Sequence, residues 1–423
     1  MKKCLKECQF LSILKLTTIF ISSYSIYFIN NEKKSNSKNK ENQILKDVIK
    51  KFNLYEEFRK PEYIIFSDLF TNKYCSDINA YSVFEYYLNK NYNNVYYIIN
   101  KKSGLYKNLV NQHKTNNLIV INDYETKIIN GELFYYLANS KIIVQSYVIR
   151  HFQKIINKVS YLKYLYINHG ITYFKSNFIN PELIYVKEEK RNIITSSPYE
   201  YNILVNKFNY SPSYIYKAGI ARYDIYKTLK INKFERDCIL VTFTHRKYNN
   251  SVFENSNYKK NLKKFLNNKS LIDFLQERNI NLIYIPHHIE LIRNKTYQQN
   301  NISYAKIKGQ NKLTKYIKKC SLLVTDFSSI CFAYMFLYKP VLFYLIDYNE
   351  TFEFREKIIN MSPNNTLFFG SLFLSQEKLI EKIKFYVNNK YNISEFLKSK
   401  FESVFYYRNK IRHKIFNIIN MLI

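Results

Sequence analysis

The chain from residue 322 to residue 348 has the sequence LLVTDFSSICFAYMFLYKPVLFYLIDY. Its pattern predicts a buried strand over residues 322–324, a polar turn, a helix, and a second apolar strand after Lys339 and Pro340. A strand that ends in small hydroxyls and opens a helix presents unpaired backbone N–H groups and the positive end of a helix dipole. This stretch therefore predicts a phosphate site within an α/β sheet.

The turn supplies four candidate phosphate ligands, which are Thr325, Asp326, Ser328 and Ser329. Asp326 is expected to orient the turn and not to bind a metal. Capping of the helix alone is the simpler alternative for the two serines. Asp347, after the second strand, is a weaker candidate for a nucleotide contact.

The length of 423 residues allows two or three domains, and an apolar content of 47% is enough to form cores. The net charge of +32 accompanies abundant Lys and Asn, which is typical of an AT-rich genome, so part of this charge is compositional. The charge still predicts attraction to anionic membranes, polyphosphate-like polymers or nucleotides. The basic residues are dispersed and no helix-turn-helix, zinc or RNP-type motif accompanies them, so no nucleic-acid partner is expected.

Six cysteines show no CxxC pair and no regular spacing. They are Cys4, Cys8, Cys75, Cys238, Cys320 and Cys331. Without such a framework, the sequence predicts a reduced, cytoplasmic protein with neither a structural disulfide nor a zinc site.

The N-terminal residues 1–30 include the apolar run FLSILKLTTIFISSYSIYFI at 10–29, which follows several lysines. Lys15 and several Ser and Thr weaken a membrane span, and no A-x-A cleavage site follows. We expect a membrane-associated segment, for which a span and a surface helix stay open, with a buried helix as the further alternative. Residues 31–60 are polar and are expected to form a linker or a solvated helix.

From residue 61 onward, apolar strand patterns alternate with helical patterns. In the first half, strands are predicted at 63–68, 95–100, 118–122 and 141–146, with helices at 82–90 and 131–140. The alternation resumes after residue 237 with CILVTFT, a helix around 258–278, INLIYIP, CSLLVTD and PVLFYL. This spacing is typical of parallel α/β sheets and predicts two α/β domains, at 61–225 and 226–423.

Several reactive side chains follow predicted strands, at the edge where parallel sheets bind ligands. His169 and Gly170 come directly after a strand at 164–167. A histidine is suited to proton abstraction near neutral pH, and a glycine beside it indicates a close backbone approach or a positive φ. A histidine satisfied within its own loop is the alternative.

In the second half, Thr244 and Arg246 follow the first strand, and His287 and His288 follow the next. An arginine can grip a phosphate through two N–H groups. Surface polarity or an adventitious metal site is the alternative for the histidine pair.

Between the halves, the motif YKAGIARYD contains Arg222 and Asp224. A structural role at the boundary is the first interpretation of this pair, and a substrate contact is the second.

The order of these motifs resembles the CDP-glycerol glycerophosphotransferase family, which includes teichoic acid glycerol-phosphate primases and polymerases. The matching segments, over roughly residues 61–400, are NHGITYFK, AGIARYD, VTFTHRK, IPHH and VTDFSSICFAYMFLYKPVLFYLID. Each motif alone is weak, but five in the expected order are specific. The chain departs from the family at Ile171 and Thr172 (usually T-P), Ala221 (Pro), His245 (aromatic) and His288 (Pro), which leaves the acceptor and the polyol open.

The resemblance implies a GT-B-like α/β fold with two Rossmann-like domains facing a cleft, the first for the acceptor and the second for the CDP-polyol. The hydrophobic or amphipathic N-terminal helix expected above precedes them. The resemblance also implies transfer of a polyol phosphate, glycerol phosphate foremost, with release of CMP. The acceptor would be a hydroxyl of a lipid-linked glycan or of a teichoic-acid or capsule-like polymer in the cell envelope of a bacterium.

In this interpretation, His169 takes the proton of the acceptor hydroxyl, which attacks the β-phosphorus of the donor. Thr244, Arg246 and His287 join the serine turn in holding the pyrophosphate and the leaving CMP. No resident cofactor is expected, because the CDP-polyol is a substrate. No carboxylate cluster indicates Mg²⁺, although the pyrophosphate itself can recruit one.

The basic charge and the N-terminal segment predict a place at the anionic cytoplasmic face of the plasma membrane, as a peripheral protein or through a single N-terminal anchor. Two other functions stay open. One is a GT-B glycosyltransferase that uses a sugar nucleotide and releases a nucleoside diphosphate. The other is a non-catalytic protein that binds polyanions.

Overall fold

The computed structural model describes residues 61–68, 78–121, 131–147, 156–157, 159, 161–173, 191–228, 238–244, 246, 253, 255–286, 302–304, 310–348 and 369–423. The predicted N-terminal segments 1–30 and 31–60 lie outside these ranges, and so do His245, His287 and His288. Within the described ranges, no helix combines the length and the apolar character that crossing a bilayer requires.

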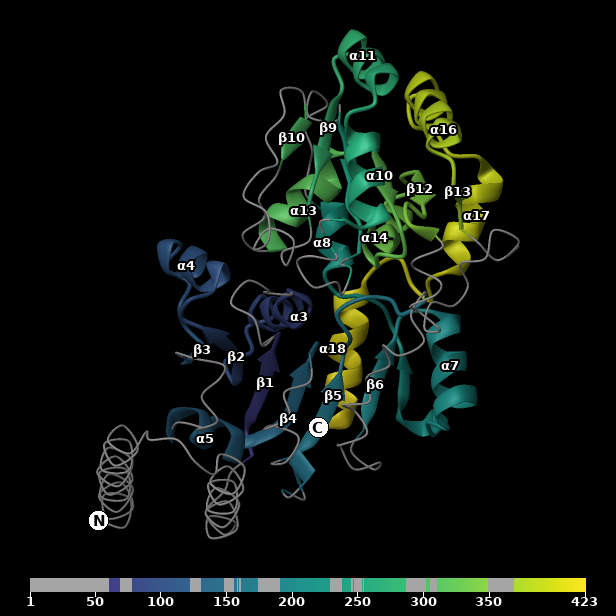
Figure 1. Cartoon of the computed structure of the whole chain (residues 1–423). Helices are drawn as coiled ribbons and strands as arrows, with labels where there is room; N and C mark the ends of the chain where they lie inside the picture. Colours follow the sequence, from purple (N-terminus) through teal and green to yellow (C-terminus); the bar gives the residue numbers. More distant parts are fainter. Residues whose placement is uncertain are drawn as a thin grey trace, which may run out of the picture.

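The first half of the chain forms a seven-stranded sheet in the order β3-β2-β1-β4-β5-β6-β7, and every pairing in it is parallel (Figure 1). Its strands are β1 (Tyr63–Ser67), β2 (Val95–Asn100), β3 (Leu118–Ile121), β4 (Ser140–Gln145), β5 (Lys163–Tyr166), β6 (Asn192–Thr195) and β7 (Ile215–Lys217). The helices of this half are α3 (Asn79–Leu88), α4 (Gly104–Asn111), α5 (Gly131–Ala138), α7 (Pro198–Phe208) and α8 (Tyr223–Thr228).

The second half forms a six-stranded, fully parallel sheet in the order β10-β9-β8-β11-β12-β13. Its strands are β8 (Cys238–Val241), β9 (Asn281–Tyr284), β10 (Ile302–Tyr304), β11 (Leu322–Thr325), β12 (Val341–Tyr344) and β13 (Ser371–Phe373). The helices are α10 (Asn257–Leu266), α11 (Lys269–Glu277), α13 (Gln310–Lys319), α14 (Ile330–Phe336), α16 (Gln376–Asn388), α17 (Glu395–Ser403) and α18 (Ile411–Leu422).

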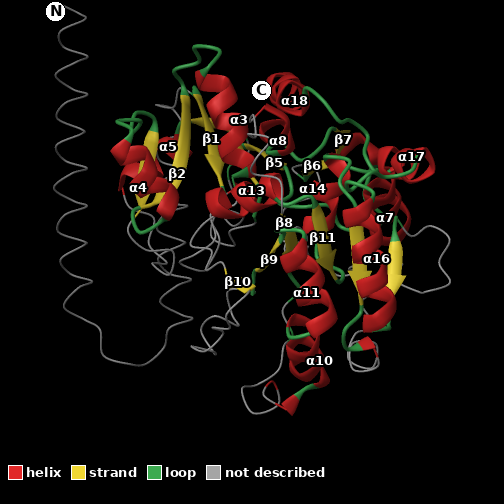
Figure 2. Cartoon of the chain, turned by 90° about the horizontal axis from the view of Figure 1, so that it is seen from above, coloured by secondary structure: helices red, strands yellow, loops and turns green. Residues whose placement is uncertain are grey.

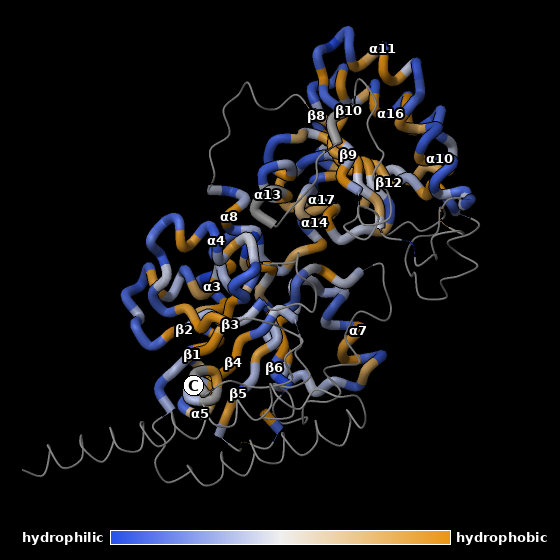
Figure 3. Tube along the Cα trace, turned by 60° about the vertical axis from the view of Figure 1, so that its left-hand side comes forward, coloured by the Kyte–Doolittle hydropathy of each residue, from blue (hydrophilic) through white to orange (hydrophobic). Residues whose placement is uncertain are grey.

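The central strands of the second sheet are buried on both faces, which explains their unbroken apolar sequences. Every residue of CILV in β8, LLVT in β11 and VLFY in β12 is buried. Figure 2 shows helices on both sides of the sheets, and Figure 3 shows apolar strands beneath helices with hydrophilic outer faces. The structure therefore has the two α/β halves that the alternation predicts.

The helix predicted around 258–278 is two helices, α10 and α11, so that single-helix prediction is wrong. Asn268 stands between them with a non-helical ψ of 113°, and its side-chain oxygen accepts a hydrogen bond of 3.0 Å from the backbone N–H of Leu271. An asparagine that caps a following helix competes with helix continuation, which gives the break its physical reason.

The last helix, α18, packs back onto the first half of the chain (Figure 1). Its buried side chains Ile411, Ile415 and Ile419 join one apolar cluster with residues of both sheets. The Tyr87 hydroxyl of α3 donates a hydrogen bond of 3.0 Å to Asn420 on this helix. The two halves are therefore connected at α18 as well as at the chain crossover, and the domain boundaries drawn at 225 and 226 stay a prediction.

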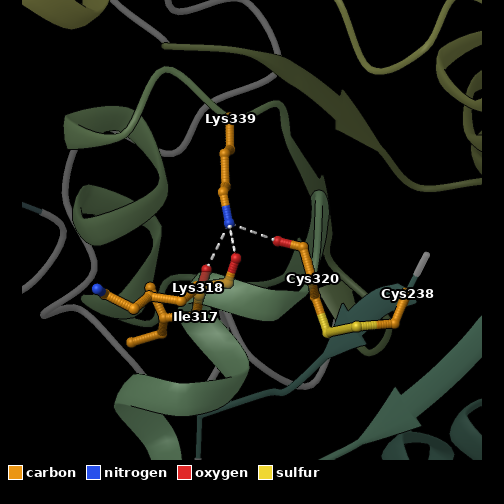
Figure 4. The surroundings of a disulfide bond; sticks show 5 residues. All are labelled: Cys238, Ile317, Lys318, Cys320 and Lys339. Carbon is orange, nitrogen blue, oxygen red and sulfur yellow. Dashed lines mark hydrogen bonds between the residues drawn. A yellow bond between two sulfur atoms is a disulfide. The ribbon is translucent and has the colours of Figure 1, made fainter. Parts of the chain in front are cut away.

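Cys238 and Cys320 form a disulfide bond, so the prediction of no structural disulfide is wrong (Figure 4). Cys238 begins β8, and Cys320 lies two residues before β11, the strand that pairs with β8. The backbone N–H of Ser321 donates to the Cys238 carbonyl at 2.8 Å, which brings the two Cα atoms to 4.5 Å. The cysteines lie 82 residues apart in the chain, so only the strand order places them together.

Lys339, which precedes Pro340, makes a set of hydrogen bonds beside this disulfide (Figure 4). Its ammonium donates to the backbone carbonyls of Ile317 and Lys318 at 2.7 Å and of Cys320 at 2.9 Å. These carbonyls belong to the C-terminal end of α13, where a cation satisfies unpaired acceptors and the helix dipole. Lys339 therefore holds the turn before β12 to the helix that precedes β11.

Candidate active site

The predicted histidine turn and the predicted serine turn lie against each other, although they come from different sheets. His169 and Gly170 follow β5, and Ser329 precedes α14. A Cβ atom built on Gly170 would lie 3.4 Å from the Ser329 hydroxyl oxygen. Three residues further along, the ring of Tyr173 lies 6.1 Å from that of Phe332 on α14. The segment after His169 therefore runs along the start of this helix.

The imidazole of His169 stacks on Tyr147, which follows β4, with ring centroids 4.3 Å apart and an interplanar angle of 14°. The histidine is partly buried, as a group that exchanges a proton with a bound substrate should be. Tyr147 was not among the predicted site residues, and its only signal in the sequence is a position just after a strand.

Asn168, not Gly170, takes the left-handed backbone conformation that the turn needs, with a φ of 50°. Its side-chain oxygen accepts hydrogen bonds from the backbone N–H groups of His169 at 2.7 Å and Gly170 at 3.4 Å. Gly170 lies instead close to Ser329, where an added Cβ would be in ordinary van der Waals contact with the hydroxyl. Asparagine tolerates this conformation because its short amide bonds to the local backbone.

Two polar side chains, the buried Asn79 and the half-buried Arg222, hold the carbonyl side of the same turn. Asn79, at the start of α3, donates to the carbonyls of Ile167 at 3.0 Å and Asn168 at 2.6 Å. Arg222 donates from its guanidinium to the carbonyl of His169 at 2.6 Å. Its own backbone N–H donates to Asn79 at 3.1 Å. Arg222 thus lies behind the candidate base and supports it.

Asp224 lies away from this turn and receives the backbone N–H of Arg412, at the start of α18, at 2.8 Å. Burial raises the pKa of Asp224 against that hydrogen bond and the nearby arginine. The pair Arg222 and Asp224 therefore connects the histidine turn and the last helix, in line with its structural interpretation.

In the second sheet, Arg246 lies in a buried network with two carboxylates. Its guanidinium donates twice to Asp347, at 2.6 Å each, and once to Asp326 at 2.7 Å. A fourth bond of 2.6 Å goes to the carbonyl of Thr244. Burial alone would lower the pKa of Arg246, but the two aspartates outweigh it and raise the pKa above its ordinary value.

These contacts change the expected role of Arg246 as a phosphate ligand. The side chain is only 3% exposed, and its guanidinium lies 4.7 Å from the Tyr258 ring centroid and 4.9 Å from that of Phe327. Four of its five N–H groups are already used, which leaves little capacity for a bidentate phosphate grip. Asp347 likewise serves Arg246, so its nucleotide contact gains no support from this geometry.

Thr244 and Thr325 also serve the scaffold. Asp326 accepts the backbone N–H and the hydroxyl of Thr244 at 2.9 Å and 2.8 Å. The Thr325 hydroxyl donates a hydrogen bond of 2.6 Å to the carbonyl of Thr242, which directly follows β8. The carboxyl ends of β8 and β11 are therefore joined through Asp326 and Thr325, and the orientation of the serine turn by Asp326 stays a prediction.

Ser328 and Ser329 differ from these neighbours in being accessible. Ser328 is half-buried and Ser329 is exposed, and neither hydroxyl makes a side-chain hydrogen bond within the described part of the chain. Ser329 occupies the N-cap position of α14 without a capping bond, so the capping alternative gains no support there. Because α14 has only seven residues, an anion bound here would depend more on the two hydroxyls than on the helix dipole.

The chain leading to His287 leaves the same sheet edge. The backbone N–H of Ile285, after β9, donates to Val241 at 2.8 Å, and the Thr242 hydroxyl donates to the Ile285 carbonyl at 2.9 Å. His287 and His288 themselves lie outside the described residues, so their roles stay predictions. Among the described residues, no group of three or more His, Cys, Asp or Glu side chains is placed to hold a metal ion.

Sequence analysis also missed Asp68, which follows β1. Its carboxylate accepts the backbone N–H groups of Ala80 at 2.8 Å and Tyr81 at 2.7 Å, the Tyr97 hydroxyl at 3.0 Å, and the Ser146 hydroxyl. Asp68 thereby joins the start of α3 to the segment between β4 and Tyr147. The available signal was an S-D pair directly after an apolar strand.

Comparisons with known proteins agree on one family. The family model described as CDP-Glycerol:Poly(glycerophosphate) glycerophosphotransferase matches residues 48–420. The minor teichoic acid biosynthesis protein GgaB of Bacillus subtilis (strain 168) is 25% identical over 368 residues, and the match covers 81% of this chain. The chain spans 38% of the length of GgaB.

Solved structures agree on the fold. The structure of the wall teichoic acid polymerase TagF has a TM-score of 0.62 at 17% identity and covers 90% of this chain and 94% of its own. The complex of S. aureus MnaA with UDP has a TM-score of 0.53 at 14% identity and covers 85% of this chain and 98% of its own. The predicted GT-B-like α/β fold is confirmed, and the chain belongs to the CDP-glycerol:poly(glycerophosphate) glycerophosphotransferase family.

Proposed function

We propose that this chain transfers glycerol phosphate, or a related polyol phosphate, from a CDP-linked donor to an acceptor hydroxyl, with release of CMP. The observation that carries the proposal is the contact between the turn at His169 and Gly170 and the Ser329 hydroxyl. This contact supports the pairing of a candidate base that follows one sheet with accessible candidate anion ligands that follow the other. Family membership supports the donor class.

In the proposed reaction, His169 accepts the proton of the acceptor hydroxyl as its oxygen attacks the β-phosphorus of the donor. A new oxygen–phosphorus bond forms, and the bond to the bridging oxygen breaks, so that this oxygen leaves with CMP. Ser328 and Ser329 hydrogen-bond the donor phosphates in this proposal. His287 stabilises charge on the leaving CMP, and Arg246 orients the turn through Asp326.

The acceptor in this proposal is a lipid-linked glycan or a teichoic-acid or capsule-like polymer at the cytoplasmic face of the plasma membrane. GgaB is named for teichoic acid biosynthesis, and one solved structure is of a histidine variant of TagF soaked with CDPG. The net charge of +32 and the apolar run at 10–29 support contact with an anionic membrane surface.

The test is CMP release by the purified chain, with CDP-glycerol and CDP-ribitol offered separately beside a membrane extract as the acceptor source. We expect acceptor-dependent CMP release with one donor. His169→Asn should reduce it by roughly 10²- to 10⁴-fold, the usual contribution of a general base. His113→Asn is the matched control, because His113 is exposed and lies in the segment that follows α4, outside both turns.

The outcomes separate the rival functions. Release of a nucleoside diphosphate from a sugar nucleotide, with no CMP from either donor, would support a glycosyltransferase instead. Binding of polyanions that survives His169→Asn, with no product from any nucleotide donor, would support a non-catalytic role.

A further inference from the structure

Glu200 is a buried carboxylate that the proposed reaction does not use. It lies in the first turn of α7, within the sequence Ser197-Pro198-Tyr199-Glu200, and is 3% exposed. The Ser197 side chain accepts the backbone N–H of Glu200 at 3.1 Å, as in a capping box. A helix cap alone, however, would not require a carboxylate so far from water.

The Glu200 carboxylate joins two separate loops. One oxygen accepts the backbone N–H of Thr172 at 2.7 Å and the side-chain amide of Asn168 at 3.4 Å. The other oxygen accepts the backbone N–H of Ser196 at 2.7 Å. No Lys or Arg side chain pairs with Glu200 in the described part of the chain, so backbone and amide N–H groups and the Ser197 hydroxyl stabilise its charge.

Asn168 links Glu200 to the turn that contains the candidate base His169. Its amide donates to Glu200, while its oxygen accepts the N–H groups of His169 and Gly170. Thr172, on the other side of the turn, is held by Glu200 directly. The turn that faces Ser329 is therefore bonded to the same carboxylate on both of its sides.

We propose that Glu200 is a positioning residue, which in its ionised form fixes the turn of His169 and Gly170 against Ser329 through Thr172 and Asn168. This inference rests on the proposed function for its catalytic consequence, but its structural content can be tested without substrate. Protonation places a hydrogen on one of the two oxygens, which face hydrogen-bond donors. The turn is then held less tightly.

The surroundings of Glu200 place this protonation near neutral pH. Burial raises the pKa of Glu200 to about 7, against hydrogen bonds from Thr172, Ser196 and Ser197 that lower it. The other titratable groups that face the carboxylate are Tyr223 of α8 and Tyr406, which follows α17. Burial raises the pKa of both tyrosines, so neither changes charge in the same range.

The first test is amide hydrogen exchange of the full chain at pH 6 and pH 8, corrected for the intrinsic exchange rate. In the wild type, protection of residues 168–172 should fall about tenfold at pH 6, which is the effect of losing one buried hydrogen bond. In Glu200→Gln the protection of residues 168–172 should be low at both pH values, because the glutamine amide turns its NH₂ group toward another N–H donor. Ser103→Ala, which removes the N-cap of α4 in the same half, is the control and should leave residues 168–172 unchanged.

The second test is kinetic and uses CMP release. Glu200→Gln and Asn168→Gly, which keeps the positive φ and removes the amide, should each lower kcat at least tenfold with KM for the donor nearly unchanged. Because both variants cut one connection, the double variant should lose little more than either alone. Unchanged exchange of residues 168–172 in Glu200→Gln would overturn the inference. If exchange of residues 168–172 changes in Glu200→Gln but the wild-type chain releases no CMP, the role of Glu200 would be supported and the proposed function would be rejected.

Discussion

At the carboxyl edge of the first sheet, one buried carboxylate without a cation holds the histidine turn, whereas at the edge of the second sheet Arg246 pairs with two aspartates. The first arrangement depends on a group with a pKa of about 7. The second depends on an arginine whose charge is fixed at any ordinary pH. The comparison predicts that the first-sheet edge of the candidate site responds to protonation and that the second-sheet edge does not.

The largest effect is expected from Asp347→Ala, which leaves the Arg246 charge buried with half of its partners. Removing one partner of a buried ion pair costs about 3–5 kcal/mol. Denaturant unfolding should therefore show a large loss of stability at every pH tested. Glu395→Ala, which breaks the exposed pair with Lys398, is the control and should change little. A small loss of stability in Asp347→Ala would contradict the claim that the second-sheet edge depends on the buried pairs of Arg246.

The next effect separates the edges by pH. The folded pKa of Glu200, about 7, lies above the ordinary 4.5, so the folded state binds this proton more tightly. The resulting stability is fully present below pH 4.5 and is lost as pH rises to about 7, on the order of 3 kcal/mol. Unfolding of the wild type and of Glu200→Gln from pH 4.5 to 8 should show this difference in slope. Parallel curves would contradict the assigned titration.

Stability and activity should then respond to pH in opposite directions. Ionised Glu200 destabilises the fold but holds the turn, so CMP release should rise over the same range in which stability falls. A profile in which both fall together above pH 7 would argue against a positioning role.

The disulfide fastens only the second sheet, and breaking it should cost about 2–4 kcal/mol. Cys238→Ala should lower the unfolding midpoint, and reductant should have no further effect on that variant. Peptide mapping without reductant should recover Cys238 joined to Cys320 in the wild type. Cys331 is buried and takes no part in this disulfide, so it serves as the internal control for thiol labelling in denaturant.

The smallest effect concerns Gln145, the last residue of β4. Its side chain is fully buried, and neither amide atom has a hydrogen-bond partner within the described part of the chain. Gln145→Met should stabilise the fold by about 1 kcal/mol, since it removes an unsatisfied buried amide of similar size. A loss of stability would show that the amide has a partner in the folded protein.

Much of the fold was predictable because buried parallel strands have continuous apolar sequences. The strands expected at 63–68, 95–100 and 118–122 correspond to β1, β2 and β3 within one residue. The short strands β7 (IYK) and β13 (SLF) were missed, since three residues at a sheet edge carry no clear periodicity.

Within the site, sequence order named His169, Ser328 and Ser329, whose positions after strands are a local property of the chain. The partners that hold them were not predictable, because Glu200 reaches the histidine turn only through the packing of α7 beside it. Arg246 shows the same limit. Its position after β8 suggested a phosphate ligand, and only the three-dimensional structure reveals Asp347 and Asp326 around its guanidinium.

The return of α18 to the first half has a practical consequence for dissecting the molecule. A fragment ending before residue 411 would leave the face of α3 that carries Tyr87 without its cover. The first half should therefore be difficult to obtain alone, and a synthetic peptide of residues 411–422 should bind it and restore its solubility. Fragment complementation would thus measure directly the contact of α18 with α3, which connects the two halves of the chain.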